Sequence, residues 1–239
     1  MRINWNYIKA FVLLVLVVFL YAFSLERSAK RNLAEVSVEF LGENNLYITQ
    51  ETVNKLLIQN QAQVTSVPKE TLDLNELESA LNSNTMIKSA EVYLTVDGTV
   101  KADVKQRNPI ARVHGDESYY IDDQGLVMPL SENHSAHVPL VTGSIKADEL
   151  GNVFLMATKI NEDAFLKKHI VEVNQSDNGN IVLISRVLGF KIHVGDLKSL
   201  DKKINNFKAF YQKARKDNVL DKYSKVSLQF VNQVVCTKK

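Results

Sequence analysis

Residues 91–104 read EVYLTVDGTVKADV, and this stretch has the pattern of a β-hairpin. Apolar residues alternate with polar ones on both sides of Asp97-Gly98. An Asp-Gly pair between two alternating runs is typical of a tight hairpin turn, because the turn residues adopt positive φ angles. We therefore predict two strands, over 92–96 and 100–104, that pair antiparallel.

The residues before the hairpin predict one strand and two helices. Residues 36–40 alternate apolar and polar side chains, as a half-buried strand does. Thr49 precedes one run with helical spacing, and Asp73 precedes a second run whose leucines share a face. The order β-α-α-β-β over 35–106 predicts a three-stranded sheet covered by two helices.

The chain after Pro109 is rich in predicted strands. Pro109 restricts Asn108 to an extended conformation and marks a domain boundary. We expect strands over 110–114, 118–121, 126–130, 138–141, 170–173, 181–184, 190–194 and 226–231. A helix is expected over 148–161, and the longest one begins after Asp196, which we interpret as its N-cap. The fold class is therefore α+β, with a β-rich second domain and flanking helices.

Residues 10–23 read AFVLLVLVVFLYAF and contain no charge, glycine or proline. With its flanks this apolar run covers 7–25, close to the about 20 residues that a membrane-spanning helix needs. A buried core helix and a cleaved signal peptide are alternatives, but the run lacks an amphipathic face and no small-residue cleavage site follows it. We interpret it as an uncleaved signal anchor. The positions that mark the expected span are Tyr7, Ala10, Leu14, Val18 and Phe23.

The charges that flank this run do not decide its orientation. Arg2 and Lys9 precede its apolar core, and Arg27, Lys30 and Arg31 follow it, so the positive-inside rule gives no clear preference. The large mass of chain after the run favours a short cytoplasmic tail and a translocated C-terminal part. We therefore expect a single-pass type II protein of the cell (inner) membrane with a large extracytoplasmic or periplasmic region.

The composition excludes several classes of function. The net charge is +2 with both signs mixed along the chain, so no basic block indicates nucleic acid binding. The single cysteine, Cys236, has no partner for an internal disulfide.

His134 and His137 lie in a polar loop, and a metal site would need a third ligand and fixed geometry. A solvated loop is the interpretation we prefer, although carboxylates near enough to supply that ligand are Asp116, Glu117, Asp122 and Asp123. Asp122 and Asp123 lie at a turn, where aspartate accepts backbone hydrogen bonds. We expect no catalytic site, no metal and no cofactor.

Five short segments together resemble one protein family. They are VSVEFLG (36–42), IKSAEV (87–92), QRNPIA (106–111), YIDDQG (120–125) and VPLVTG (138–143). Their order and spacing, after a single N-terminal anchor, are similar to those of the FtsQ/DivIB family of bacterial cell-division proteins. In that family the first two belong to a POTRA domain, the third to the junction between domains, and the last two to the start of a β domain. Gln106 is a departure, because glutamate is common there.

The resemblance implies a domain organisation for the whole chain. The expected segments are a short cytoplasmic tail (1–6), a transmembrane signal anchor (7–25), a juxtamembrane linker (26–34), a POTRA domain (35–107), a β domain (108–235) and a C-terminal tail (236–239).

The resemblance also implies a non-enzymatic scaffold that is enriched at the division septum. Members of the family bind small single-pass coiled-coil proteins of the FtsB and FtsL type and so link septal-ring proteins to the septal peptidoglycan synthase. The binding mode it implies is strand addition to the edge of the last strand. Here that strand is predicted over 226–231, and the POTRA domain would supply a second surface over 74–104. The residues expected to bind the partner are Val226, Leu228, Gln229, Phe230 and Asn232.

Other interpretations remain open at this point. A POTRA-bearing accessory of protein transport or assembly would need tandem POTRA units, and only one is predicted here. An anchored cell-wall hydrolase would need paired carboxylates or metal ligands on rigid elements, whereas the candidates here lie in loops. For Phe230, burial in the core is the alternative to partner contact, because period-two alternation also places it inward.

Overall fold

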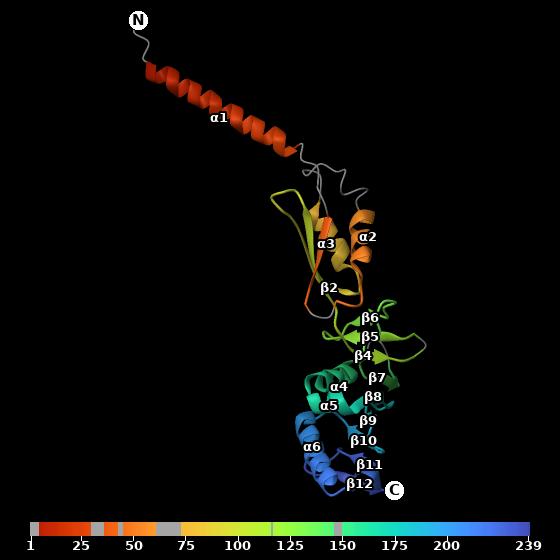
Figure 1. Cartoon of the computed structure of the whole chain (residues 1–239). Coiled ribbons are helices and arrows are strands. Elements are labelled where there is room, and N and C mark those ends of the chain that lie inside the picture. Colours follow the sequence, from red (N-terminus) through yellow and green to blue (C-terminus); the bar gives the residue numbers. More distant parts are fainter. Residues whose placement is uncertain (1–4, 30–35, 43–44, 61–72, 116, 146–149) are drawn as a thin grey trace. The chain divides into compact units, whose positions relative to one another are not determined.

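The computed structural model describes residues 5–29, 36–42, 45–60, 73–115, 117–145 and 150–239 (Figure 1). The chain divides into two compact units, Met1–Gln106 and Arg107–Lys239. Each unit has its own hydrophobic core. Helices and strands occur in both, which confirms the α+β class predicted from the sequence.

The first unit begins with α1 (Trp5–Ala29), a helix of 25 residues. Every side chain that the structure describes on it, at residue 5 and over 9–23, is exposed. Within the described part of the chain, no helix combines the length and the apolar character that crossing a membrane requires. The span over 7–25 therefore stays a prediction. Residues 1–4 of the expected tail and 30–34 of the expected linker lie outside the described residues.

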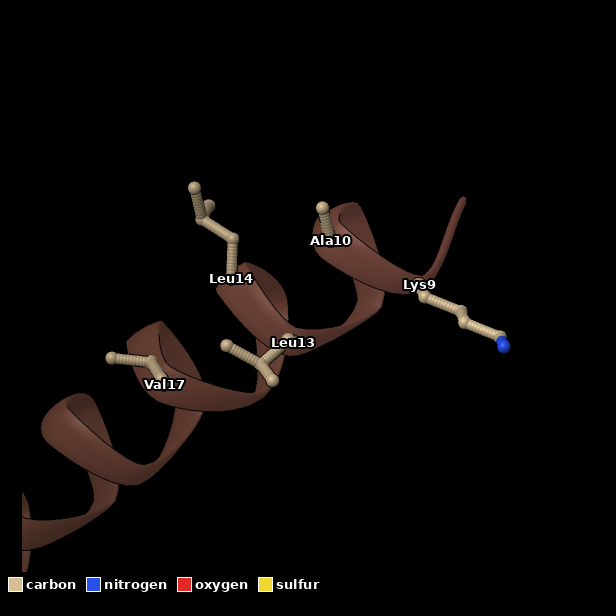
Figure 2. Close-up of a pocket in the computed structure, with 5 residues that line it drawn as sticks. All are labelled: Lys9, Ala10, Leu13, Leu14 and Val17. Atoms are coloured by element: carbon tan, nitrogen blue, oxygen red, sulfur yellow. The ribbon is translucent and has the colours of Figure 1, made fainter. Parts of the chain in front are cut away.

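A hollow on α1 is lined by five residues whose side chains Figure 2 draws as sticks: Lys9, Ala10, Leu13, Leu14 and Val17. All five residues belong to this one helix and lie on successive turns of it. The hollow is therefore the space between neighbouring side chains of a helix surface, and its lining is almost entirely apolar. It has no group of polar atoms that would recognise a small molecule.

In the part that the structure describes, the rest of the first unit is a three-stranded sheet packed against two helices. β1 (Val36–Leu41) pairs parallel with β3 (Val100–Gln106), and β3 pairs antiparallel with β2 (Ile87–Leu94). The helices are α2 (Gln50–Asn60) and α3 (Leu74–Asn82). Their buried residues Val53, Leu57, Leu77 and Leu81 form the core with the sheet. This arrangement confirms the order β-α-α-β-β.

Both helices have a side-chain N-cap at the position that the sequence predicts. Thr49 Oγ1 accepts a hydrogen bond from Thr52 N (3.2 Å), ahead of α2. Asp73 Oδ1 accepts from Asn75 N (3.0 Å) and Glu76 N (3.1 Å), ahead of α3. Each cap satisfies N–H groups that have no partner inside the helix.

The hairpin between β2 and β3 has a longer loop than the Asp-Gly pair alone suggests. Gly98 has the positive φ, 94°, that the turn requires. Thr95 N donates to Thr99 O (2.9 Å), so the loop already begins at Thr95. The strand predicted over 92–96 therefore ends at Leu94, and Val96 lies in the loop with its side chain 91% exposed.

Gln106 lies at the end of β3, and its side chain is buried. Its Oε1 accepts from Tyr47 N (2.9 Å) and Ile48 N (3.2 Å), and its Nε2 donates to Ile48 O (2.9 Å). A carboxylate at this position could accept the first two bonds but could not donate the third. The amide therefore satisfies three main-chain groups where glutamate would satisfy two, which gives a physical reason for the departure at this position.

Over the described residues, the second unit contains a nine-stranded sheet in the order β12-β11-β10-β9-β8-β7-β4-β5-β6. α4 (Gly151–Glu162), α5 (Ala164–His169) and α6 (Leu200–Lys216) lie along one side of the strands (Figure 1). Their buried side chains, Met156, Leu166 and Phe207 among them, pack against the sheet. The first seven strands in chain order are β4 (Pro109–Val113), β5 (Tyr119–Asp122), β6 (Val127–Pro129), β7 (Leu140–Gly143), β8 (Ile170–Gln175), β9 (Ile181–Ser185) and β10 (Lys191–Gly195).

The longest helix of this unit begins later than predicted. Asp196 is not its N-cap, because α6 starts at Leu200. Asp196 Oδ1 instead accepts from Nζ of the buried Lys203 (2.7 Å). Lys203 also donates to the main-chain oxygens of Val194 (3.1 Å) and Asp196 (2.7 Å), so all three of its donors are used. The aspartate therefore neutralises a buried ammonium instead of capping a helix.

The sequence-based prediction omits α5. Its N-cap is Asp163, whose Oδ1 accepts from Phe165 N (3.0 Å) and Leu166 N (3.2 Å). An aspartate followed by a short apolar pair is the signal that identifies this helix. The helix is only six residues long, which is too short for helical periodicity to stand out.

Candidate partner-binding edge

The last strand of the second unit is β12 (Val235–Lys238), and the prediction of a last strand over 226–231 is wrong. β11 (Tyr223–Ser227) ends four residues earlier than predicted, and it pairs parallel with β10 and antiparallel with β12. The segment 236–239, expected as a tail, therefore contains most of a strand. The error arises because Val226, Leu228 and Phe230 continue a period-two pattern past the point where the chain leaves the sheet.

Two of the residues expected to bind a partner belong to the core. Val226 and Leu228 are 0% and 1% exposed. Leu228 N donates to His193 O (2.7 Å), which holds this residue against β10. Neither side chain is accessible to a partner, so the prediction of a contact through them is wrong.

The loop between β11 and β12 is held in place by α6. Asn206 Nδ2 donates to Val231 O (2.9 Å), and Lys202 Nζ donates to Asn232 Oδ1 (2.8 Å). Phe230 lies on this loop and is 54% exposed, so it is not a core residue. Gln229 and Asn232 are exposed on the same loop. The loop therefore presents an aromatic side chain on a backbone that α6 restrains.

The nine-stranded sheet has two edges, β6 and β12, over the described residues. β6 has three residues and ends on Pro129, which has no N–H to offer an added strand. β12 has four residues without proline, and the side chains of Val235 and Thr237 are exposed on it. An edge strand presents unpaired N–H and C=O groups to another chain. β12 is therefore the edge of this sheet that is better suited to strand addition.

Positive charge lies close to this edge. In the strand register, Lys225 of β11 lies opposite Lys191 of β10 and Thr237 of β12. Burial lowers the pKa of His193 below its ordinary value, and the neighbouring Lys225 and Lys191 lower it further. His193 is therefore neutral at pH 7, and the basic side chains on these strands include Lys191, Lys225 and, on β12 itself, Lys238.

Cys236 lies in β12, opposite Val226. Its side chain is partly buried against the core, and burial raises the pKa of the thiol above its ordinary value. A thiol with a raised pKa carries little thiolate at neutral pH and reacts slowly. Its environment is that of a small apolar residue in the strand.

The side chains considered for catalysis or metal binding have structural contacts. Asp122 is fully buried, and its Oδ1 accepts from Gln124 N (3.0 Å) and Leu126 N (2.8 Å), which confirms its role in the turn. The loop that carries the two histidines is held by Tyr120, whose hydroxyl accepts from Ala136 N (3.0 Å). Among the described residues, no group of three or more His, Cys, Asp or Glu side chains is placed to hold a metal ion.

Sequence reasoning missed Val235 and Thr237 as residues of the edge. Asn232-Gln233 is a polar interruption between two apolar runs, and such an interruption favours a turn. This signal would have separated β11 from β12, with the second strand beginning after it.

Over the described residues, the fold defines a class of protein: a two-unit α+β protein whose second sheet ends in an edge strand, β12, that can form main-chain contacts with another chain. Comparisons with known families identify the units. A family model described as a POTRA-like domain matches residues 35–105, and one described as FtsQ/DivIB, C-terminal related, matches residues 108–237. The second match covers more than half of the chain, which therefore belongs to the FtsQ/DivIB family. A comparison with curated proteins finds no match. Both families are of non-catalytic scaffold types, and the combination is typical of proteins associated with cell division.

Proposed function

We propose that the protein is a non-enzymatic scaffold of the bacterial division complex and that its β12 edge accepts a strand from a partner. The observation that carries the proposal is the position of β12 at the edge of a nine-stranded sheet in a chain of the FtsQ/DivIB family. In strand addition, main-chain hydrogen bonds supply the affinity and alternate side chains supply the selectivity. The same contacts do not require a pocket or a cofactor.

The added strand would lie beside Val235 and Thr237 of β12. Phe230, on the restrained loop that precedes β12, is the exposed aromatic side chain closest to this edge in sequence, and aromatic anchors contribute strongly to interfaces. Gln229 is exposed on the same loop and remains a candidate contact. Asn232 already binds Lys202, so we assign it to holding the loop.

In this proposal the partners are small single-pass coiled-coil proteins of the FtsB and FtsL type, and the septal peptidoglycan synthase is reached through them. The lysines at 191 and 225 favour a partner segment that carries carboxylates. The mixed charge of the chain offers no support for a nucleic acid partner.

We also propose that α1 anchors the protein in the cell inner membrane, with the two folded domains on the extracytoplasmic side. At 1.5 Å per residue, its 25 residues extend over about 37 Å. Its exposed side chains include Phe11, Leu16 and Phe19, and the described apolar side chains surround the helix without a polar face. Such a surface is unfavourable in water and favourable in hydrocarbon.

The double substitution Val235→Glu, Thr237→Glu tests the edge. Charged side chains on an edge strand oppose pairing with another strand, and carboxylates also repel an acidic segment. Binding of an FtsB- or FtsL-type partner to the full chain in detergent should fall by roughly 100-fold in a pull-down titration. Circular dichroism should be unchanged, because both side chains are exposed.

Val187→Glu is the matched control. Val187 is an exposed valine, 73% accessible, in the loop between β9 and β10. This variant should bind the partner as the unmodified chain does. If the double variant binds as tightly as this control, the partner does not add to β12.

Septal enrichment of a fluorescent fusion tests the broader division role, which a uniform distribution in dividing cells would contradict.

A further inference from the structure

The outer edge of β2 is bonded to side chains of α3. β2 is an edge strand, because the order of the three-stranded sheet is β1-β3-β2. The side-chain amide of Asn82, the last residue of α3, accepts from Ala90 N (2.8 Å) and donates to Ala90 O (3.3 Å). Glu78, one helical turn earlier, accepts from Val92 N (3.2 Å). Three main-chain groups of β2 are thus taken by helix side chains.

These three groups are ones that a neighbouring strand would otherwise use. In an antiparallel edge strand, alternate residues direct their N–H and C=O groups away from the sheet. Ala90 and Val92 are two such residues, since their partners belong to α3. A primary amide offers one donor and one acceptor direction side by side, as the main chain of a paired strand does. Asn82 therefore occupies the place that an added strand would need at Ala90.

The other edge of this sheet has a similar contact from a helix. Gln50, the first residue of α2, donates from Nε2 to Val38 O of β1 (2.8 Å). In the described part of the chain, no helix side chain is hydrogen-bonded to the main chain of β12. The side-chain contacts of β12 in the described residues come from its neighbouring strand: Ser224 Oγ of β11 donates to Thr237 O (3.3 Å) and Lys238 O (3.2 Å). Helix side chains therefore protect both edges of the first sheet and leave the edge assigned to the partner uncovered.

We propose that Asn82 and Glu78 form an edge plug that prevents β2 from pairing with β2 of a second copy of the chain. β2 has eight residues, which is long enough for an antiparallel strand pair about a two-fold axis. An unprotected edge of this length is a hazard for self-association. The inference goes beyond the scaffold function, because it concerns the POTRA-like domain and holds whichever partner binds at β12.

The double substitution Glu78→Ala, Asn82→Ala in the full chain in detergent tests the plug. Hydrogen exchange, resolved to single amides by fragmentation, should be about tenfold faster at Ala90 and Val92, because each amide loses its acceptor. Sedimentation should detect a concentration-dependent dimer. The matched control is Glu76→Ala, Ser79→Ala, two substitutions on the exposed side of α3, which should remain monomeric with unchanged exchange.

The proposal is contradicted if the double variant stays monomeric at every concentration while its circular dichroism is like that of the unmodified chain. In that case Asn82 and Glu78 are not what prevents β2 from pairing with a second copy. Unchanged exchange at Ala90 and Val92 contradicts the proposal as well. If the double variant does not fold, Glu78→Ala alone keeps the Asn82 pair and should accelerate exchange at Val92 only. Equal acceleration at both amides in that single variant would overturn the assignment of Asn82 to Ala90.

Discussion

Gly143→Ala is expected to lower the melting temperature of the β domain by roughly 10 °C. Gly143 is the last residue of β7, has a φ of 97°, and lies opposite Gln175 of β8. A Cβ at this position would overlap the main-chain oxygen of Gln175 and lie 2.9 Å from its carbonyl carbon. Positive φ and overlap with main chain each cost on the order of 1–3 kcal/mol. We expect a loss of about 3 kcal/mol, because neither strand can move without disturbing their pairing.

Scanning calorimetry of the full chain in detergent measures this effect. The matched control is Gly151→Ala, at the first residue of α4, where a Cβ would meet no atom within 4 Å. Alanine is a better helix former than glycine, so this control should melt at the same temperature or slightly higher. A Gly143→Ala variant that melts with the control would contradict the close approach of β7 and β8.

Asp122→Ala is expected to destabilise the β domain by a similar amount, about 3 kcal/mol. The Asp122 side chain is 0% exposed, and its Oδ2 accepts from Nη1 of Arg107 (2.7 Å), whose side chain is 16% exposed. Its Oδ1 accepts from the main-chain N–H groups of Gln124 and Leu126 in the turn before β6. Alanine would remove the turn contacts and leave a largely buried guanidinium without this carboxylate.

Asp122→Asn separates the two contributions. Asparagine can still accept the turn hydrogen bonds but carries no charge for Arg107, so we expect roughly half of the loss. Asp177→Ala removes an exposed carboxylate from the turn between β8 and β9 and should stay within about 0.5 kcal/mol of the unmodified chain. Urea titration gives the three values. An alanine variant as stable as the Asp177→Ala control would contradict the buried ion pair.

Local signals in the sequence predicted most elements of the first domain. The caps at Thr49 and Asp73 begin their helices, and Gly98 has the positive φ of the hairpin turn. In the second domain, an Asn-Gly pair at 178–179, which is a local signal for a hairpin turn, joins β8 and β9 with a φ of 77° at Gly179. These features depend on residues a few positions apart, so a short stretch of sequence contains the information.

The end of the chain could not be predicted in this way. Whether Leu228 and Phe230 continue β11 depends on Lys202 and Asn206, which hold the following loop from α6. These contacts join residues that are far apart in the sequence, and alternation alone does not reveal them. The same holds for the parallel pairing of β10 with β11, which places β12 at the edge.

The side-chain contacts of the sheet edges were also beyond sequence reasoning. The bonds from Asn82 to Ala90 and from Gln50 to Val38 need the folded domain to be recognised. Helix side chains are bonded to the edges of the first sheet, and β6, at one edge of the second sheet, is short and ends on Pro129. Among the described residues, β12 is the edge strand that has neither feature. This contrast is the physical basis for assigning partner binding to β12.

Cysteine cross-linking tests strand addition at β12 most directly. The chain has one cysteine, so Cys236→Ser with Thr237→Cys leaves a single thiol on the exposed side of the edge strand. Paired residues of adjacent strands have Cβ atoms about 4.5–5.5 Å apart, close to the separation of a disulfide. Against single cysteines placed along an FtsB- or FtsL-type partner, a disulfide should form at the position opposite residue 237 and not at its two immediate neighbours, because strand residues alternate between faces. Cross-links that recur every three to four positions, or a bound partner without cross-links, would contradict it.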